Sequence, residues 1–151
     1  MVKLTLKDGS VKEVENGLTY AEIIKGIGMG LYKAACCVKI NGQVKDLRDI
    51  ADTDGMFEVC TFDSNDGKLA FRHTASHLLA EAVKSLYPEA KLARGPATDS
   101  GFYYDFEVAK PFTPDDLDKI EAEMKRLAKL SEDVERFELS TEEAIKLMEE
   151  K

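Results

Sequence analysis

Residues 1–28 have the sequence MVKLTLKDGSVKEVENGLTYAEIIKGIG, and this stretch decides the fold of the first part of the chain. Apolar and polar residues alternate over residues 2–7, a period of two that predicts a half-buried β-strand. Asp8 and Gly9 then form a typical hairpin turn, so we expect residues 11–14 to return as a second strand. The chain is therefore predicted to open with a β-hairpin.

A helix is predicted directly after this hairpin. Thr19 can cap its first turn, and Glu22, three residues later, completes a capping box. Gly26, Gly28 and Gly30 are expected to end the helix, because glycine is common at helix C-termini. The side chains expected to face the sheet are those of Ala21, Ile24 and either Ile27 or Ile23.

The residues that follow complete a small β-rich unit. Residues 36–40 form an apolar strand, Asn41 and Gly42 are a strong hairpin signal, and residues 43–45 are expected to pair back. Residues 56–62 supply the final strand. The order hairpin, helix, hairpin, strand is typical of a ubiquitin-like β-grasp.

A polar, turn-forming stretch at residues 63–67 separates this unit from the rest of the chain. We therefore expect a β-grasp domain over residues 1–62 and a second domain over residues 63–151. Helices layered on a mainly antiparallel sheet are predicted for the second domain, which gives the whole chain the α+β class. Its expected elements are a helix over 68–86, an aromatic strand over 102–108, a helix capped by Thr113, a strand over 134–139, and a helix capped by Ser140 with Glu143.

The composition is that of a soluble globular protein. Hydrophobic residues make up 44% of the 151 residues and charged residues 33%. No apolar run approaches the roughly 20 residues that a bilayer span needs, and the N-terminus has no signal-peptide pattern. We therefore expect no membrane partner and a cytoplasmic location.

The charge distribution and the cysteine content bear on nucleic-acid binding and on the state of the thiols. Residues 113–151 hold 13 acidic and 7 basic groups and so contribute most of the net charge of −8. The total charge therefore neither excludes nor indicates nucleic-acid binding, which needs only a local positive surface. The cysteines, Cys36, Cys37 and Cys60, are odd in number and form no C-x-x-C pair, which favours buried, reduced thiols.

His73 and His77 are the only histidines in the chain. A spacing of four on a predicted helix places both rings on one face. Such a pair can ligate a metal ion, orient a water or bind a polar substrate, or it can simply be two surface or hydrogen-bonded core residues. A zinc-hydrolase motif is disfavoured, because Thr74 stands where the general-base glutamate would be and only a distant carboxylate would supply a third ligand.

An aromatic run over residues 101–106 is the second candidate cluster. On a strand, Phe102, Tyr104 and Phe106 share one face, and core packing is the interpretation that we favour for the two phenylalanines. A phenol on a pocket wall can also donate a hydrogen bond to a substrate or stack on a base. Tyr104 is therefore a candidate binding residue, with core packing as its alternative.

Three motifs follow one another in the second part of the chain: RHTASHLLA at residues 72–80, Gly95-Pro96, and GFYYDF at residues 101–106. In this order they closely resemble the opening of the editing domain of the threonyl-tRNA synthetase family. Residues 1–62 resemble the TGS domain that precedes it in that family, a β-grasp shared with certain GTPases and stringent-response enzymes. Alanyl-tRNA editing domains share the histidine motif but are less similar in the tyrosine segment and lack the TGS domain.

The resemblance implies a proofreading role. The editing domain of the family hydrolyses seryl-tRNA that is formed by mistake on threonine tRNA. His73 and His77 would line the pocket for the seryl ester at the tRNA 3′ end, and His73 would position or activate the water or the terminal ribose hydroxyl. Tyr104 would contact the terminal nucleotide or the substrate. No metal is implied for this pocket, although the alanyl relatives bind zinc with a similar pair.

The sequence also departs from the family pattern. Ser76 stands where alanine is expected, and the C-x-x-x-H element that completes the family's pocket does not occur before Lys151. We therefore expect an N-terminal fragment with little deacylase activity and no cofactor of its own. ATP, magnesium and zinc would belong to the catalytic domain that is absent. The parent enzyme would dimerise through that domain, and the fragment would be a monomer.

Two rival interpretations remain open. The first is a non-catalytic TGS module joined to a helical partner-binding segment, as in a stringent-response regulator, in which His73 and His77 are incidental. The second is a zinc-dependent trans-editing protein related to alanyl-tRNA editing domains. The TGS-like first half argues against the second rival.

Overall fold

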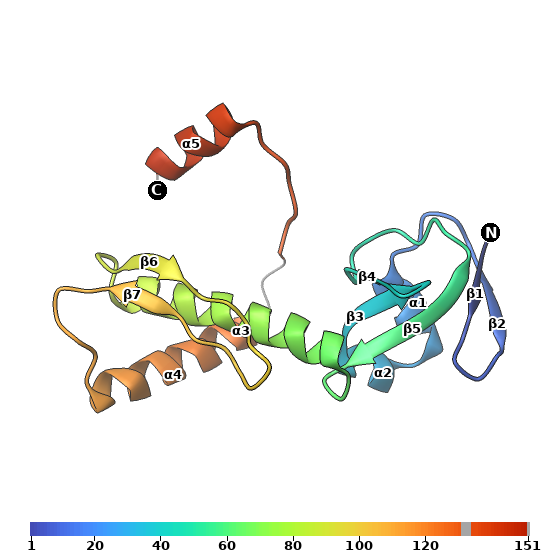
Figure 1. The fold of residues 1–151 in the computed structure, drawn as a ribbon, viewed down its shortest axis with the longest axis horizontal. Helices are drawn as coiled ribbons and strands as arrows, with labels where there is room; N and C mark the ends of the chain where they lie inside the picture. Colours follow the sequence, from blue (N-terminus) through green and yellow to red (C-terminus); the bar gives the residue numbers. More distant parts are fainter. Residues whose placement is uncertain (131–133, 151) are drawn as a thin grey trace.

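The computed structural model describes residues 1–130 and 134–150. A long helix, α3 (Asn65–Leu86), connects a five-stranded sheet with its two helices to a smaller part built on α4 (Pro114–Leu130) (Figure 1). The last helix, α5 (Thr141–Glu149), lies apart from both (Figure 1). Within the described residues, no helix combines the length and the apolar character that crossing a bilayer requires.

The five-stranded sheet has the strand order β2-β1-β5-β3-β4. Its strands are β1 (Val2–Thr5), β2 (Val11–Val14), β3 (Ala35–Ile40), β4 (Gln43–Lys45) and β5 (Gly55–Thr61). The first and last strands, β1 and β5, are parallel neighbours. Strand β1 also pairs antiparallel with β2, and β5 pairs antiparallel with β3, which forms the second hairpin with β4. This topology confirms the predicted β-grasp and, with the helices, the α+β class.

Helix α1 (Tyr20–Ile27) packs its apolar face on this sheet. The predicted capping box is present, because the Thr19 hydroxyl accepts from the Glu22 amide while the Glu22 carboxylate accepts from the Thr19 amide. Ile23 rather than Ile27 faces the core, since 2% of Ile23 and 37% of Ile27 is exposed. The first core consists of Val2, Leu4, Val14, Tyr20, Ile23, Ile24, Val38, Ile40, Ala51 and Phe57.

The three glycines expected to end the first helix differ in their roles: Gly28 ends it as predicted, whereas Gly26 lies within it. Helix α1 does end at Gly28, whose amide donates to the Ile24 carbonyl, but a second short helix, α2 (Met29–Ala34), follows at once. Gly30 lies inside α2 and does not stop it. A glycine within a helix costs only about 1 kcal/mol relative to alanine, which neighbouring contacts readily offset.

Helix α3 begins at Asn65, inside the stretch that was expected to be a linker. The Ser64 hydroxyl accepts from the Gly67 amide at 3.1 Å and donates to the Thr61 carbonyl at 2.9 Å, so the cap is tied to the end of β5. An ion pair between Lys39 of β3 and Asp66 adds a second tether. The sheet therefore passes into the helix through a tight turn, and the division of the chain at residues 62 and 63 stays a prediction.

The second part has a small core between α3, α4 and a two-stranded sheet. Strands β6 (Lys91–Arg94) and β7 (Asp105–Glu107) are antiparallel. The fully buried members of this core are Ala82, Val83, Ala90 and Ile120. On α4, Ile120 is buried and Met124 and Leu127 are partly buried, whereas Leu117 is 58% exposed.

Three predictions for this part need correction. The aromatic strand expected over 102–108 is only β7, because Phe102 forms no more than an isolated bridge with Ala97. Strand β6 was not predicted. The strand expected over 134–139 is absent: these residues lie beside no strand in the described part of the chain, and a lone extended segment gains no ladder hydrogen bonds. The cap of α5 by Ser140 and Glu143 is confirmed.

Replacing Gly67 with alanine is expected to destabilise the turn between β5 and α3. An added Cβ would lie 1.9 Å from the Thr61 carbonyl oxygen, a backbone atom that cannot move away without shifting the strand. Overpacking of this kind costs roughly 1–3 kcal/mol, which urea denaturation followed by circular dichroism would measure. Gly26→Ala is the control, because nothing lies within 4 Å of its added Cβ, and it should be neutral or slightly stabilising. Equal stability of the two variants would contradict the proposed contact.

Asp116 makes the packing of α3 on α4 sensitive to acid. The Thr113 amide and hydroxyl donate to its carboxylate, as does the Tyr87 hydroxyl at 2.8 Å, and these hydrogen bonds hold the pKa of Asp116 well below its usual range. A lowered folded-state pKa stabilises the protein above the unfolded-state value near 3.9, and the contribution is lost as the pH falls further.

Asp116→Asn should therefore lower the melting temperature at pH 7 and weaken its decline below about pH 4. Thermal unfolding monitored at 222 nm across this range would test the expectation. Asp118→Asn is the matched control on the same helix, since Asp118 is exposed and makes no hydrogen bond in the described part of the chain. If the melting temperature of Asp116→Asn fell below about pH 4 as steeply as that of the wild type, this role of Asp116 would be ruled out.

Candidate functional site

The two histidines are in contact on α3. His73 Nε2 and His77 Nε2 lie 3.2 Å apart, and the ring planes are nearly perpendicular at 85°. A hydrogen bond at this distance needs an N–H on one ring and a bare nitrogen on the other, and which ring donates depends on the tautomers. The predicted shared face is therefore present, and the pair is both a proton donor and a proton acceptor.

His73 borders a hollow of about 560 Å³. Its other lining residues come from the β4 edge, the first turns of α3 and the loop after β6: Val44, Asp66, Leu69, Ala70, Pro96 and Ala97. His77 contacts His73 but is not among the lining residues. Both histidines are exposed, and His73 meets a space large enough for a small polar group.

Ser76 supports the backbone beneath the pair. Its side chain is fully buried, and its hydroxyl donates to the His73 carbonyl at 2.7 Å. Ser76, which stands where alanine was expected, is therefore a buried polar side chain whose hydrogen-bonding requirement is met within the helix.

Tyr104 lies in a different setting from the histidines. Its ring is half-buried and stacks on Phe106 with centroids 4.9 Å apart. The ring also covers Gly95 so closely that a Cβ there would lie 2.0 Å from Tyr104 Cδ2. Its hydroxyl makes no hydrogen bond within the described residues, and the structure brings it into contact with neither histidine. The function of Tyr104 stays a prediction.

Arg72 is a residue of this region whose role sequence reasoning missed. Its Nη1 donates to the Thr98 carbonyl at 3.1 Å and to the Asp99 carbonyl at 2.6 Å. The guanidinium also lies 5.9 Å from the Phe62 ring centroid. In the sequence, the one signal for Arg72 was its place directly before His73. No local pattern could reveal its partners, since they lie far away along the chain.

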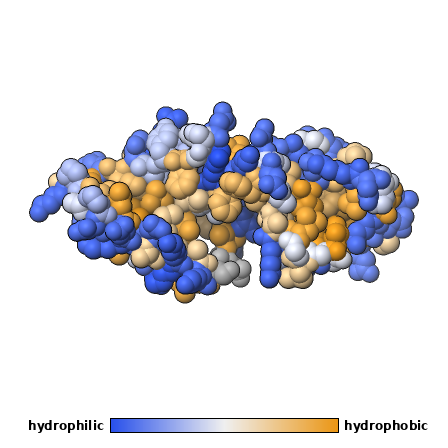
Figure 2. Space-filling model, turned by 90° about the horizontal axis from the view of Figure 1, so that it is seen from below, coloured by the Kyte–Doolittle hydropathy of each residue, from blue (hydrophilic) through white to orange (hydrophobic). Residues whose placement is uncertain are grey.

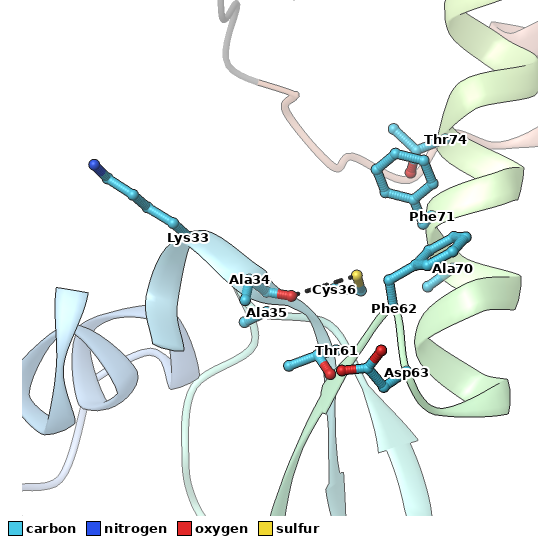
Figure 3. A pocket seen from close by; sticks show the side chains of 10 residues that line it. All are labelled: Lys33, Ala34, Ala35, Cys36, Thr61, Phe62, Asp63, Ala70, Phe71 and Thr74. Carbon is cyan, nitrogen blue, oxygen red and sulfur yellow. Dashed lines mark hydrogen bonds between the residues drawn. The ribbon is translucent and has the colours of Figure 1, made fainter. Parts of the chain in front are cut away.

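One of the three cysteines, Cys36, lines a second hollow of about 480 Å³ between the β-grasp unit and α3 (Figure 3). Cys36 reaches its edge and its thiol donates weakly to the Ala34 carbonyl at 3.7 Å. Burial raises the pKa of Cys36, and burial together with the neighbouring Cys60 raises the pKa of Cys37 to about 12. These thiols are therefore protonated and unreactive at neutral pH.

Metal ligation is not supported by the donor set around the histidines. Structural and catalytic zinc sites use at least three protein ligands. Among the residues that the structure describes, no third His, Cys, Asp or Glu joins the pair in a geometry that would hold an ion. The pair is better suited to proton transfer or to hydrogen bonding.

Comparisons with known proteins relate the whole chain to one kind of enzyme. The TGS domain matches residues 2–61. The chain is 55% identical over 150 residues to a threonine–tRNA ligase of Clostridium perfringens, covering 99% of this chain and 23% of the relative. It is 53% identical over 151 residues to the threonine–tRNA ligase of Acetivibrio thermocellus and 54% identical to that of Clostridium botulinum. The chain thus spans about a quarter of the length of these relatives.

Gly95→Ala is expected to displace the Tyr104 ring from its stack on Phe106. The added Cβ would overlap the ring at 2.0 Å, and the ring must turn away because its near edge, not a flexible end, is in the way. Ring-proton chemical shifts of Tyr104 and Phe106 in NMR spectra would report the loss of stacking. Gly101→Ala is the control, since its Cβ would meet nothing within 4 Å. Unchanged ring shifts in Gly95→Ala would contradict this arrangement.

Proposed function

We propose that this chain, which carries a TGS domain and is related over its whole length to the N-terminal part of threonine–tRNA ligases, supplies the histidine side of a proofreading site for seryl-tRNA. The parent activity would be the ATP-dependent attachment of threonine to its tRNA. The observation that carries the proposal is the His73–His77 contact beside a hollow bordered by His73.

The chemical need for such a site follows from the substrates of the proposed ligase. Serine lacks one methyl group of threonine and fits any pocket that admits threonine. The missing group provides only about 1–3 kcal/mol of discrimination at the activation step. A second site that hydrolyses the wrong product is the established solution to this problem, and its substrate would be the seryl ester at the 3′ end of threonine tRNA.

The imidazole pair has the properties that ester hydrolysis requires. A water must lose a proton as it attacks the carbonyl, and the ribose oxygen must gain one as it leaves. One ring of the pair donates through Nε2–H and keeps a bare Nδ1, while the other accepts through Nε2 and keeps Nδ1–H. The pair therefore offers a proton acceptor and a proton donor, with His73 nearest the substrate and Tyr104 proposed to contact the terminal nucleotide.

No metal is proposed to take part in this reaction. ATP, magnesium and zinc would instead serve the aminoacylating domain of the ligase. The partner would be threonine tRNA, encountered in the cytoplasm by a homodimeric ligase, whereas the isolated 151-residue chain would be a monomer with little deacylase activity of its own.

Replacing His73 or His77 with alanine should abolish most seryl-tRNA hydrolysis. The assay would use the Clostridium perfringens ligase with its 150 matching residues exchanged for this sequence, because the relative supplies the remaining domains. Loss of a general acid or base typically lowers the rate about 10²–10⁴-fold, while threonine attachment should not change. Thr74→Ala is the control, since Thr74 lies between the histidines in sequence but lines the hollow at Cys36 and not the one at His73. Unimpaired deacylation in His73→Ala and His77→Ala would refute the proposal and favour an incidental pair.

A further inference from the structure

The wall of the hollow that faces α3 is a loop with little support of its own. Pro96 and Ala97 line the hollow and belong to the loop between β6 and β7. The loop closes on itself: the Thr98 amide donates to the Gly101 carbonyl at 2.7 Å, and the Gly101 amide donates to the Thr98 hydroxyl at 3.1 Å. These bonds shape the loop but do not attach it to the helix.

Arg72 provides that attachment. The hydrogen bonds from its Nη1 to the Thr98 and Asp99 carbonyls, at 3.1 and 2.6 Å, are the only ones that join residues 95–101 to α3 in the described part of the chain. Because the donor is charged, these bonds are stronger than bonds between neutral groups, and the bond to Thr98 is also partly shielded from water.

The same side chain is held on its other side by the β-grasp unit. Its guanidinium lies over Phe62, which directly follows β5, and Phe62 packs edge to face on Phe71 with centroids 5.2 Å apart. Figure 3 shows these two phenylalanines beside each other where the sheet meets α3. A planar guanidinium can stack on an aromatic ring and donate in its own plane at once, which the ammonium group of lysine cannot do equally well.

We propose that Arg72 is a positioning residue that fixes the loop 95–101 against α3 and thereby sets the width of the hollow at His73. Because Phe62 of the β-grasp unit lies against the Arg72 guanidinium, this unit also influences the width of the hollow. The consequence for substrate selection rests on the proposed proofreading function, whereas the attachment of the loop does not. A wider hollow would admit the extra methyl of threonine, so Arg72 would help to restrict hydrolysis to the seryl ester.

The structural part can be tested on the 151-residue chain by NMR relaxation. Arg72→Ala should release the loop, so that the amide order parameters of residues 98–101 fall from about 0.85 toward values below about 0.6. Lys68→Ala is the matched control: Lys68 lies one turn earlier on α3 and borders the same surface recess as Arg72, Thr98 and Asp99, and its side chain makes no hydrogen bond or ion pair in the described residues. Order parameters that stay high in Arg72→Ala, with unchanged amide shifts in β1–β5 to show that the fold is intact, would overturn the proposal.

The functional part uses the ligase that carries this sequence in place of its own matching residues. Arg72→Ala should lower kcat/KM for seryl-tRNA by about 10²-fold, as expected for misplacement by about 1 Å, and should raise hydrolysis of threonyl-tRNA relative to seryl-tRNA. Arg72→Lys should recover part of both effects, and Lys68→Ala should show neither.

The two tests distinguish failure of this proposal from failure of the proofreading function. A ligase with wild-type Arg72 that hydrolyses no seryl-tRNA would refute the proofreading function, and the relaxation data would still decide whether Arg72 holds the loop. An active ligase whose preference for seryl-tRNA is the same with Arg72→Ala would overturn the role in selection.

Discussion

The carbonyl oxygen of Thr61 fixes how the two parts of the molecule are related. It accepts hydrogen bonds from the Ser64 amide at 3.0 Å and from the Ser64 hydroxyl at 2.9 Å, and Gly67 lies against it without room for a side chain. Helix α3 therefore leaves the sheet in one direction. His73 lies six residues after Gly67, or about 9 Å along the axis at 1.5 Å per residue, so this turn also fixes the histidine relative to the sheet.

The hollow at His73 depends on that arrangement because no single unit forms it. Val44 from the β4 edge, Ala70 from α3 and Pro96 from the following loop each contribute one side. The second core is small, and many apolar side chains are exposed over both units (Figure 2). Charged and tightly packed contacts, such as the Lys39–Asp66 pair and the Gly67 turn, accordingly matter more here than in a larger core.

Features that depend on neighbouring residues were predictable from the sequence. The hairpin turn at Asp8 and Gly9 and the capping boxes that begin at Thr19 and Ser140 are set by short-range hydrogen bonds, and all appear where they were expected. The spacing of His73 and His77 likewise fixed their shared face.

Features that depend on distant partners were not predictable. The stretch at residues 134–139 becomes a strand only if another strand lies beside it, and in the described chain none does. The roles of Arg72 and Gly95 arise from Thr98, Asp99 and Tyr104, whose proximity follows from the tertiary fold and not from any local pattern. The same holds for Val44, which lies 29 residues before His73 and still borders the same hollow.

The position of His73 restricts which imidazole nitrogen can accept the proton of the attacking water in the proposed hydrolysis. Of the two imidazoles, His73 borders the hollow, so in the proposed reaction a water held there would give its proton to a nitrogen of His73. Its Nε2 is engaged with His77 at 3.2 Å, which leaves Nδ1 as the acceptor. Nδ1 is bare only when His73 carries its proton on Nε2 and donates to His77, whose own proton then lies on Nδ1. In the proposed reaction His77 would therefore select the reactive tautomer of His73, and a substitution at His77 would impair hydrolysis without any contact between His77 and the substrate.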